Sequence, residues 1–417
     1  MLRRDTIVEV ISDSLEKEIP ELVPRELSVP LDLKIKRAIS IVGPRRAGKT
    51  FYMFYLMKKI KKNVLYLNFE DYRLLGITYK ELAKIIEVYY EMFPENRRRK
   101  VFFFFDEIQN VERWEKIVRS LLDNENVQIF ITGSSSKLLS KEISTELRGR
   151  TLSYEIFPFS FREFIIASKF EIGKHLTSYK KAKLKNLLEE YLRFGGYPET
   201  LFFEDKKKIL DEIWEVTIAR DIIERWKIRN VKALYLLIKA LKASKEFSVH
   251  RFYNYLKSSG IFVSKNTLYN YMQYLNDALI VFPLKRYSTS YKDIEKSIPK
   301  IYFVDSGLYL DDFDLSRALE NIVFIELKRR GFKENKTLFY YKTSNNKEID
   351  FIIRKEDINI IEVAYELDQE HVKKTKKAME ELKQKNGLII TWDEEDIIKE
   401  NNREIKILPL WKFLTTI

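Results

Sequence analysis

The segment 41–50 constrains the fold of this chain more than any other stretch. It follows a short apolar strand and precedes an apolar, helix-like segment. It contains the pattern G-x-x-x-x-G-K-T, made of Gly43, Pro44, Arg45, Arg46, Ala47, Gly48, Lys49 and Thr50. Its two glycines let the backbone curl so that successive N–H groups face one anion, and the following helix adds its dipole. This order of strand, loop and helix predicts a nucleotide-binding P-loop in an α/β sheet.

A second motif supports the first. The apolar run 101–105 ends in Asp106 and Glu107. Such a run is typical of a strand buried on both faces of a parallel sheet, and its C-terminal end lies where ligands bind. We predict that Lys49 contacts the outer phosphates, that Thr50 and Asp106 hold Mg²⁺, and that Glu107 orients or deprotonates the attacking water. The alternative is that the two acids only cap a strand end.

Four further residues are candidates for sensing or stabilising phosphate transfer. The predicted strand 127–132 runs into Gly133 and Ser134, and a hydroxyl of Thr132 or Ser134 suits a sensor of hydrolysis. The alternative for Ser134 is a turn with a helix N-cap. Arg148 and Arg150 are candidate arginine fingers, each worth about 10³–10⁵ in rate where one operates. If a neighbouring copy supplies the finger, hydrolysis depends on a homo-oligomer; otherwise both are ordinary surface arginines.

Composition limits the class of protein. The chain of 417 residues contains no cysteine and three histidines, which excludes disulfides, thiolate catalysis and zinc fingers. No apolar run reaches the roughly 20 residues that span a bilayer, so we expect a soluble, cytoplasmic protein without a membrane partner. The net charge of +13 fits nucleic acid as a partner, and it fits equally the Lys/Glu-dense surface of a thermophilic protein.

The pattern of helices, strands and turns predicts five sections. They are an N-terminal helix and Pro-containing linker (1–30), a P-loop core (31–154), a helical lid packed on that core (155–229), a winged helix-turn-helix (230–298) and a C-terminal α/β domain (299–417). The winged-helix prediction depends on the order helix, helix, Ser-Ser-Gly turn, helix and hairpin, with Ser264 as N-cap of the third helix.

The third helix and the wing carry the candidate DNA contacts. A recognition helix places its N-terminal residues in the major groove, while wing residues touch phosphate. The predicted contacts are Lys265, Asn266, Thr267, Tyr269 and Asn270 on the helix, and Lys285 and Arg286 on the wing. The alternative is a winged helix that only packs domains together.

The C-terminal section holds three acids that resemble the core of PD-(D/E)XK nucleases. Glu320 lies on a predicted helix, and Asp350 and Glu362 lie on successive predicted strands. Gathered together, they are candidate ligands of a second Mg²⁺ or Mn²⁺ that activates water for phosphodiester cleavage. The lysine of the nuclease motif is replaced by Ala364, so an inactive version of this restriction-endonuclease-like fold is an equal alternative. Lys342 or Lys373 are candidate substitutes for the missing lysine.

The whole chain resembles archaeal and bacterial AAA+-type P-loop ATPases with a C-terminal nuclease-like domain of unknown function. The motifs that support the resemblance are Gly-Pro-Arg-Arg-Ala-Gly-Lys-Thr at 43–50, Phe-Asp-Glu-Ile-Gln at 105–109, Ile-Thr-Gly-Ser-Ser-Ser at 131–136, Leu-Arg-Gly-Arg at 147–150, Pro-Phe-Ser-Phe-Arg-Glu-Phe at 158–164, Gly-Gly-Tyr-Pro-Glu at 195–199 and Tyr-Phe-Val-Asp-Ser-Gly-Leu at 302–308. The resemblance implies ATP as the nucleotide.

Two main hypotheses follow. In the first, a Mg²⁺-dependent ATPase controls a DNA-binding or DNA-processing C-terminal half. In the second, nucleotide binding switches the docking of a protein partner, the nuclease-like domain is inactive, and DNA has no role. Steep weakening of DNA binding with salt separates them, because phosphate contacts release counterions. A third hypothesis, an ATP-gated nuclease, depends on a metal bound by the three C-terminal acids.

Overall fold

The computed structural model describes residues 2–134, 147, 149–173, 177–308, 314–355 and 358–416. They form two compact units, Met1–Phe157 with Asp277–Leu279, and Pro158–Asn276 with Ile280–Ile417. The section predicted as a lid on the P-loop core, 155–229, therefore belongs to the second unit from Pro158 onward.

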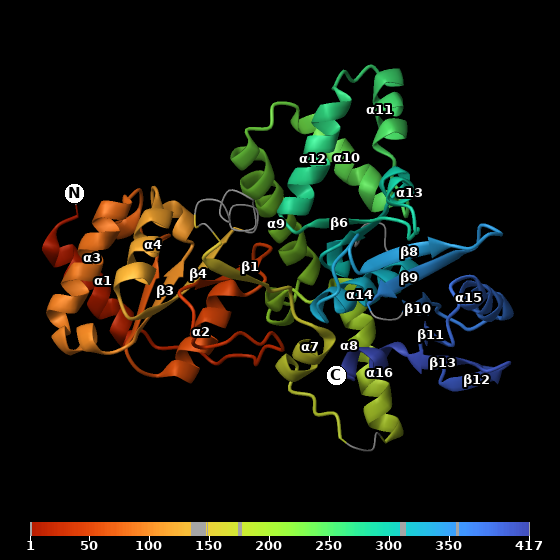
Figure 1. The fold of residues 1–417 in the computed structure, drawn as a ribbon, viewed down its shortest axis with the longest axis horizontal. Helices are drawn as coiled ribbons and strands as arrows, with labels where there is room; N and C mark the ends of the chain where they lie inside the picture. Colours follow the sequence, from red (N-terminus) through yellow and green to blue (C-terminus); the bar gives the residue numbers. More distant parts are fainter. Residues whose placement is uncertain are drawn as a thin grey trace. The chain divides into compact units, whose positions relative to one another are not determined.

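The first unit is built on a parallel sheet in the order β2-β3-β4-β1-β5 (Figure 1). The strands are β1 (Ala38–Gly43), β2 (Val64–Asn68), β3 (Val101–Asp106), β4 (Val127–Ser134) and β5 (Thr151–Glu155). The helices are α1 (Arg4–Glu16), α2 (Lys49–Ile60), α3 (Tyr79–Met92) and α4 (Trp114–Asn124), with the 3-10 turns η1 (Tyr72–Leu74), η2 (Pro94–Arg98) and η3 (Ile108–Asn110). Since β4 lies between β1 and β3, its end separates the P-loop from the two acids that follow β3.

The aromatic run of β3 explains how this sheet is buried. Successive side chains of a strand point to opposite faces. Phe103 and Phe105 pack in the cluster that contains residues of α1, α3 and α4, whereas Phe104 packs with residues of α2 on the other face. Parts of the segment 19–33 cover the α2 face as well. Both faces around β3 are therefore apolar, as the continuous hydrophobic run predicts.

The second unit begins with helices. They are α7 (Phe161–Ala167), α8 (Ser178–Phe194), η4 (Pro198–Leu201), α9 (Lys206–Thr217), the π-helix η5 (Ile218–Glu224), α10 (Val231–Ala243), α11 (Val249–Ser258) and α12 (Lys265–Asp277). The amide of Thr267 donates to the Ser264 hydroxyl at 3.0 Å, which confirms the predicted N-cap of α12. Next comes an antiparallel pair, β6 (Val281–Leu284) and β7 (Lys300–Phe303), joined through α13 (Tyr291–Lys296). The predicted domain boundary at 298/299 separates these paired strands.

A mixed sheet forms the rest of the second unit, in the order β12-β13-β11-β10-β9-β8. Its strands are β8 (Leu338–Lys342), β9 (Glu348–Arg354), β10 (Ile358–Val363), β11 (Asn386–Thr391), β12 (Asp396–Glu400) and β13 (Arg403–Pro409), accompanied by α14 (Leu315–Arg329), α15 (Gln369–Glu381) and α16 (Leu410–Thr415). The two successive strands predicted to carry Asp350 and Glu362 are confirmed as β9 and β10, whereas β12 and β13 were not predicted. Within the described ranges, no helix is both long and apolar enough to cross a membrane.

Candidate functional site

The P-loop connects β1 to α2 through two left-handed residues. Gly48 has φ 92° and Arg46 has φ 64°, and this curl brings the loop back over its own start. Gly43 allows a close approach, because a Cβ there would lie 2.2 Å from the Ile156 carbonyl oxygen. Arg25, from the linker before β1, donates to the Ala47 carbonyl at 3.0 Å and holds the loop from outside. These contacts shape the curled backbone that an anion-binding loop requires.

Lys49 is the first residue of α2, and its side chain is buried in the curl of the loop. Its ammonium donates to the carbonyl oxygens of Gly43 and Pro44, at 3.2 Å each. Both bonds are long and neither acceptor is charged. Since a phosphate oxygen is a stronger partner for an ammonium than a carbonyl, the geometry allows Lys49 to exchange these partners for a nucleotide.

Asp106, at the end of β3, is almost fully buried and accepts three hydroxyl groups. The Thr50 hydroxyl donates to Oδ2 at 2.7 Å, and the Tyr66 hydroxyl donates to the same oxygen at 2.8 Å. Thr132 of β4 donates to Oδ1. Thr50 and Asp106, the two predicted Mg²⁺ ligands, thus lie in direct contact. A hydroxyl and a carboxylate oxygen form the hard donor pair that Mg²⁺ prefers in nucleotide sites.

Glu107 follows Asp106 in a left-handed conformation, with φ 52°. Its amide donates to the Thr132 hydroxyl at 2.9 Å, and its carboxylate accepts a hydrogen bond from the Gln109 side chain. Burial raises the pKa of Glu107, and the positive charge of Lys49 only partly offsets this effect. A carboxylate with a raised pKa is a better proton acceptor, which suits the predicted role toward water.

Sequence reasoning missed several contributors to this site. Tyr66 on β2 and Gln109 after β3 contact the two acids directly, and Arg25 contacts the P-loop. The register Asn68↔Asp106 between β2 and β3 could have indicated Tyr66 as a neighbour of the β3 end. For Arg25 the sequence holds no signal. Thr132, weighed beside Ser134 as a sensor, is the hydroxyl whose contact with both acids is described.

The other predicted catalytic residues lie elsewhere. Ser134 is the last residue of β4, and the position of its side chain is outside the described set. Arg148 also falls outside the described residues. Arg150 precedes β5 and forms an ion pair with Asp123, at the edge of the sheet where the parallel strands begin, opposite the P-loop. A finger role for Arg150 therefore requires a second copy of the chain.

The predicted DNA-contacting residues divide into two groups. On α12, Asn266, Tyr269 and Asn270 are exposed, while the Lys265 ammonium contacts His250 at 2.9 Å. Lys285 forms an ion pair with Glu295 at 2.6 Å. The backbone around Lys285 and Arg286 pairs with Tyr340 of β8, and the Arg286 amide donates to Ser297. The segment predicted as a DNA-contacting wing thus extends the C-terminal sheet.

The predicted second metal site is not formed. Glu320 of α14, Asp350 of β9 and Glu362 of β10 are all buried, and two lysines, Lys300 and Lys374, form ion pairs with them. The Lys300 ammonium, from β7, pairs with Glu320, with Asp350 at 3.0 Å and with Glu348 at 2.9 Å. In the described part of the chain, no group of three or more His, Asp or Glu residues is arranged to hold a metal ion. The Lys300 ammonium lies among these acids, where the nuclease hypothesis requires a metal cation.

The electrostatics of this closed cluster follow from burial and from the two lysines. Burial raises the pKa of Glu320, and the neighbouring carboxylate of Asp350 adds to the effect. Burial acts in the same direction on Asp350, but Lys300, Lys374 and the Val363 amide together hold its pKa below the ordinary value. Asp350 is thus the acid whose charged form these neighbours stabilise.

Neither lysine predicted to replace the motif lysine reaches the acids. Lys342 pairs with Glu246 at 2.5 Å, and Lys373 is exposed on α15. The adjacent Lys374 forms an ion pair with Glu362 instead. Ala364 itself is buried. Lys374, one residue after Lys373 on α15, is the lysine that faces the sheet. The helical pattern of the sequence alone did not predict which of the two lysines would do so.

Comparisons with known proteins match three successive parts of the chain to families. Residues 35–165 match the AAA domain family, residues 185–316 match the domain of unknown function DUF8612, and residues 315–413 match the domain of unknown function DUF4143. An uncharacterized protein of Methanocaldococcus jannaschii is 39% identical over 432 residues, covering 98% of this chain and 95% of its own. The chain belongs to the family of this archaeal protein.

The family extends to bacteria. An uncharacterized protein of Haemophilus influenzae is 32% identical over 345 residues, covering 79% of this chain and 82% of its own. A solved Walker-type ATPase of Pyrococcus abyssi is 14% identical, covering 74% of this chain and 95% of that one, with a TM-score of 0.44. That score is too low to support an argument.

The AAA-domain match and the parallel sheet confirm the predicted P-loop ATPase class for the first unit. The winged-helix and restriction-endonuclease-like names for the second unit stay predictions, because the two matching families carry no fold name.

Proposed function

We propose that the first unit binds and hydrolyses ATP in a Mg²⁺-dependent reaction. The observation that supports this proposal is the convergence of four residues at the carboxyl ends of β1 and β3, on either side of β4. Lys49 lies inside the curled loop, the Thr50 hydroxyl contacts Asp106 at 2.7 Å, and Glu107 follows directly. The AAA-domain match covers all four residues.

The residues divide the work by their chemistry. The amides of 43–50 and the Lys49 ammonium would hold the phosphates, while Thr50 and Asp106 would hold Mg²⁺, which neutralises charge on the phosphates. Glu107, with its raised pKa, would accept a proton from water. Thr132 fixes the spacing of the two acids, because its hydroxyl contacts the Asp106 carboxylate and the Glu107 amide.

Two variants test the ATPase proposal. Lys49→Ala should abolish ATP binding by calorimetry while the fold persists, with Lys58→Ala on the exposed end of the same helix as control. Glu107→Gln should keep binding but lower turnover by about 10²–10⁴, the usual contribution of a general base. Glu112→Gln, an exposed acid nearby, is its control. Normal turnover in Glu107→Gln would remove that residue from the mechanism.

We propose further that the nucleotide state controls DNA binding by α12. Asn266, Tyr269 and Asn270 are exposed at helical spacing, and side chains of these types hydrogen-bond base edges. Residues 247–276 contain no Asp or Glu, although the chain has 62 of them, whereas Arg251, Lys257 and Lys265 are present. A surface without acids is compatible with the phosphate backbone.

Fluorescence anisotropy with a labelled duplex at two salt concentrations, with and without ATP, tests this part. Affinity should fall steeply with salt and change with ATP, and Asn270→Ala should weaken it by about 1–3 kcal/mol. Ser258→Ala, beyond the recognition face, is the matched control. No binding at low salt would remove DNA from the function.

The contacts of the wing favour a second candidate function. Lys285 is paired with Glu295, and the neighbouring backbone forms hydrogen bonds with β8. This segment therefore has fewer groups available to contact DNA than the sequence predicted. A nucleotide-dependent switch that docks a protein partner needs no such contacts. ATP binding without any DNA binding would favour this switch.

A further inference from the structure

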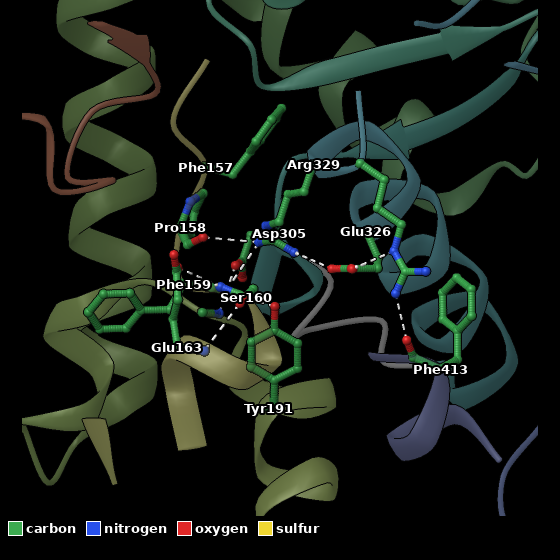
Figure 2. A network of polar contacts seen from close by, with 12 residues as sticks. Phe157, Pro158, Phe159, Ser160, Glu163, Tyr191, Asp305, Glu326, Arg329 and Phe413 are labelled. Carbon is green, nitrogen blue, oxygen red and sulfur yellow. Dashed lines mark hydrogen bonds and ion pairs between the residues drawn. The ribbon is translucent and has the colours of Figure 1, made fainter. Parts of the chain in front are cut away.

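Three motifs that have no role in the ATP site meet in one buried network of the second unit. They are the segments 158–164, 195–199 and 302–308 (Figure 2). Asp305 lies at the centre and accepts hydrogen bonds from the amides of Gly196 at 2.8 Å and Gly307 at 2.9 Å. A Cβ on Gly195 would lie 1.5 Å from Asp305 Oδ1. The glycines therefore allow the chains to close tightly around one carboxylate.

Arg329 of α14 fixes the start of the second unit within this network. Its guanidinium donates to the carbonyl oxygens of Pro158 at 3.0 Å and Phe159 at 3.1 Å (Figure 2). The Tyr191 hydroxyl donates to the Phe159 carbonyl at 2.8 Å, and the Phe159 amide donates to the Gly196 carbonyl at 2.7 Å. The backbone of Pro158 and Phe159 is thus held by buried groups from three other segments.

The two preceding residues are held just as firmly by the P-loop of the first unit. The Ile156 amide donates to the Val42 carbonyl at 2.7 Å, and Gly43 packs closely on Ile156. The Phe157 carbonyl accepts from Arg25 at 2.5 Å, and the same guanidinium holds the Ala47 carbonyl. Arg25 therefore joins Phe157 directly to the P-loop.

Only one peptide bond separates these two anchored pairs of residues. Connections between domains usually lie in exposed, flexible segments where few contacts are made. Here Phe157 and Pro158 are consecutive, and each is bonded to the interior of its own unit. A change at the P-loop is therefore one peptide bond away from a residue that is held within the second unit.

A difference between nucleotide states is available at the P-loop. Lys49 donates to the carbonyls of Gly43 and Pro44, and phosphate binding would withdraw it from them. Gly43 is the residue that packs on Ile156. The first unit therefore has a contact beside residues 156–159 that nucleotide binding would change.

We propose that residues 156–159 form a short tether through which the nucleotide state of the P-loop biases the network around Asp305 and Arg329. This proposal rests on the proposed ATP binding and names its regulatory output. A coupling of this kind requires a differential contact in each state, which the Lys49 exchange supplies.

The decisive variant lengthens the tether without touching either anchor. Gly-Ser-Gly is inserted between Phe157 and Pro158 in the full chain, and the same insertion in the exposed turn between Asn401 and Asn402 is the control. Calorimetry with a non-hydrolysable ATP analogue measures binding. Deuterium uptake of 159–164 and 191–197, with and without the analogue, measures the response.

Wild type and control should show a change of about threefold or more in exchange of these amides when the analogue binds. The tether insertion should bind the analogue equally well and lose the response. Persistence of the response in that variant, or its absence in wild type with analogue bound, would overturn the tether. Absence of binding in wild type would instead overturn the ATP site, and calorimetry separates the two failures.

Arg329→Lys provides a second measurement that keeps the charge. A lysine does not reproduce the guanidinium's two bonds to Pro158 and Phe159, so the response should shrink while analogue affinity stays unchanged. If Arg329 only stabilises the fold, the variant melts earlier but responds as wild type does, and the tether has no part in signalling.

Discussion

The P-loop site of the first unit and the acid cluster of the second unit each combine a buried lysine with nearby carboxylates, and they differ in what the lysine contacts. In the first unit Lys49 donates to two backbone carbonyls, and the acids Asp106 and Glu107 are bonded to hydroxyls, an amide and Gln109. In the second unit Lys300 pairs with three carboxylates. The first lysine can exchange its partners for a ligand, whereas the second already has its counter-charges.

This difference shows why a set of residue types does not define a site. Both centres contain a buried lysine and at least one buried acid. An ammonium on neutral carbonyls gains by moving to a phosphate, but one that leaves buried carboxylates exposes uncompensated charge, which costs several kcal/mol. The first centre is therefore arranged to bind a ligand, and the second centre stabilises the fold.

The largest expected effect separates the two lysines. Lys300→Met should lower the free energy of unfolding of the second unit by about 3–5 kcal/mol, because it leaves buried carboxylates unpaired. ATP affinity should not change. Urea unfolding with Lys292→Met, an exposed lysine, as control measures the first effect, and calorimetry the second. Adding EDTA or Mg²⁺ should leave the wild-type transition of this unit unmoved. A stable Lys300→Met protein would contradict the comparison.

The second prediction concerns the acid that the lysines do not reach. Burial raises the pKa of Asp305 to about 6 from 3.8, although the Gly196 and Gly307 amides oppose the shift. Since the folded pKa is raised, its stabilising contribution is complete below pH ~4 and is lost as pH rises through ~6. Relative to Asp305→Asn, wild type should lose about 3 kcal/mol across this window. Urea unfolding of both proteins at several pH values measures it; parallel curves would contradict the shift.

The smallest expected effect tests the hydroxyl shell of the ATP site. Tyr66→Phe removes one donor from Asp106 but leaves Thr50 and Thr132 in place. The loss of one hydrogen bond to a charged group is worth about 1.5 kcal/mol, so kcat/KM for ATP should fall roughly tenfold. Tyr72→Phe, an exposed tyrosine after the same strand, is the control. An unchanged value would mean that Tyr66 serves only packing.

The ATP site could be predicted almost entirely from the sequence. The P-loop and the acids after β3 are local patterns, and parallel strands bring their carboxyl ends to one edge of the sheet. The local patterns did not predict the residues from other segments that contact these motifs. Tyr66, Gln109 and Arg25 reach the site from other segments.

The C-terminal acids show the opposite case. Their order along the chain predicted that Glu320, Asp350 and Glu362 would gather, and they are held in one neutralised cluster. The sequence did not predict that Lys300 would reach them, because β7 was assigned to the C-terminal section and not to the β6–β7 hairpin. A single long-range partner changed a candidate metal site into an ion-pair cluster.

The sequence by itself determined the P-loop, the strands at 101–105 and 127–132 of its sheet and the N-cap of α12, since each depends on neighbours along the chain. The tertiary structure alone decided which charges are available. That choice depends on burial and on side chains distant in sequence, and in a low-dielectric interior the nearest counter-charge determines whether a carboxylate binds a ligand or holds the fold together.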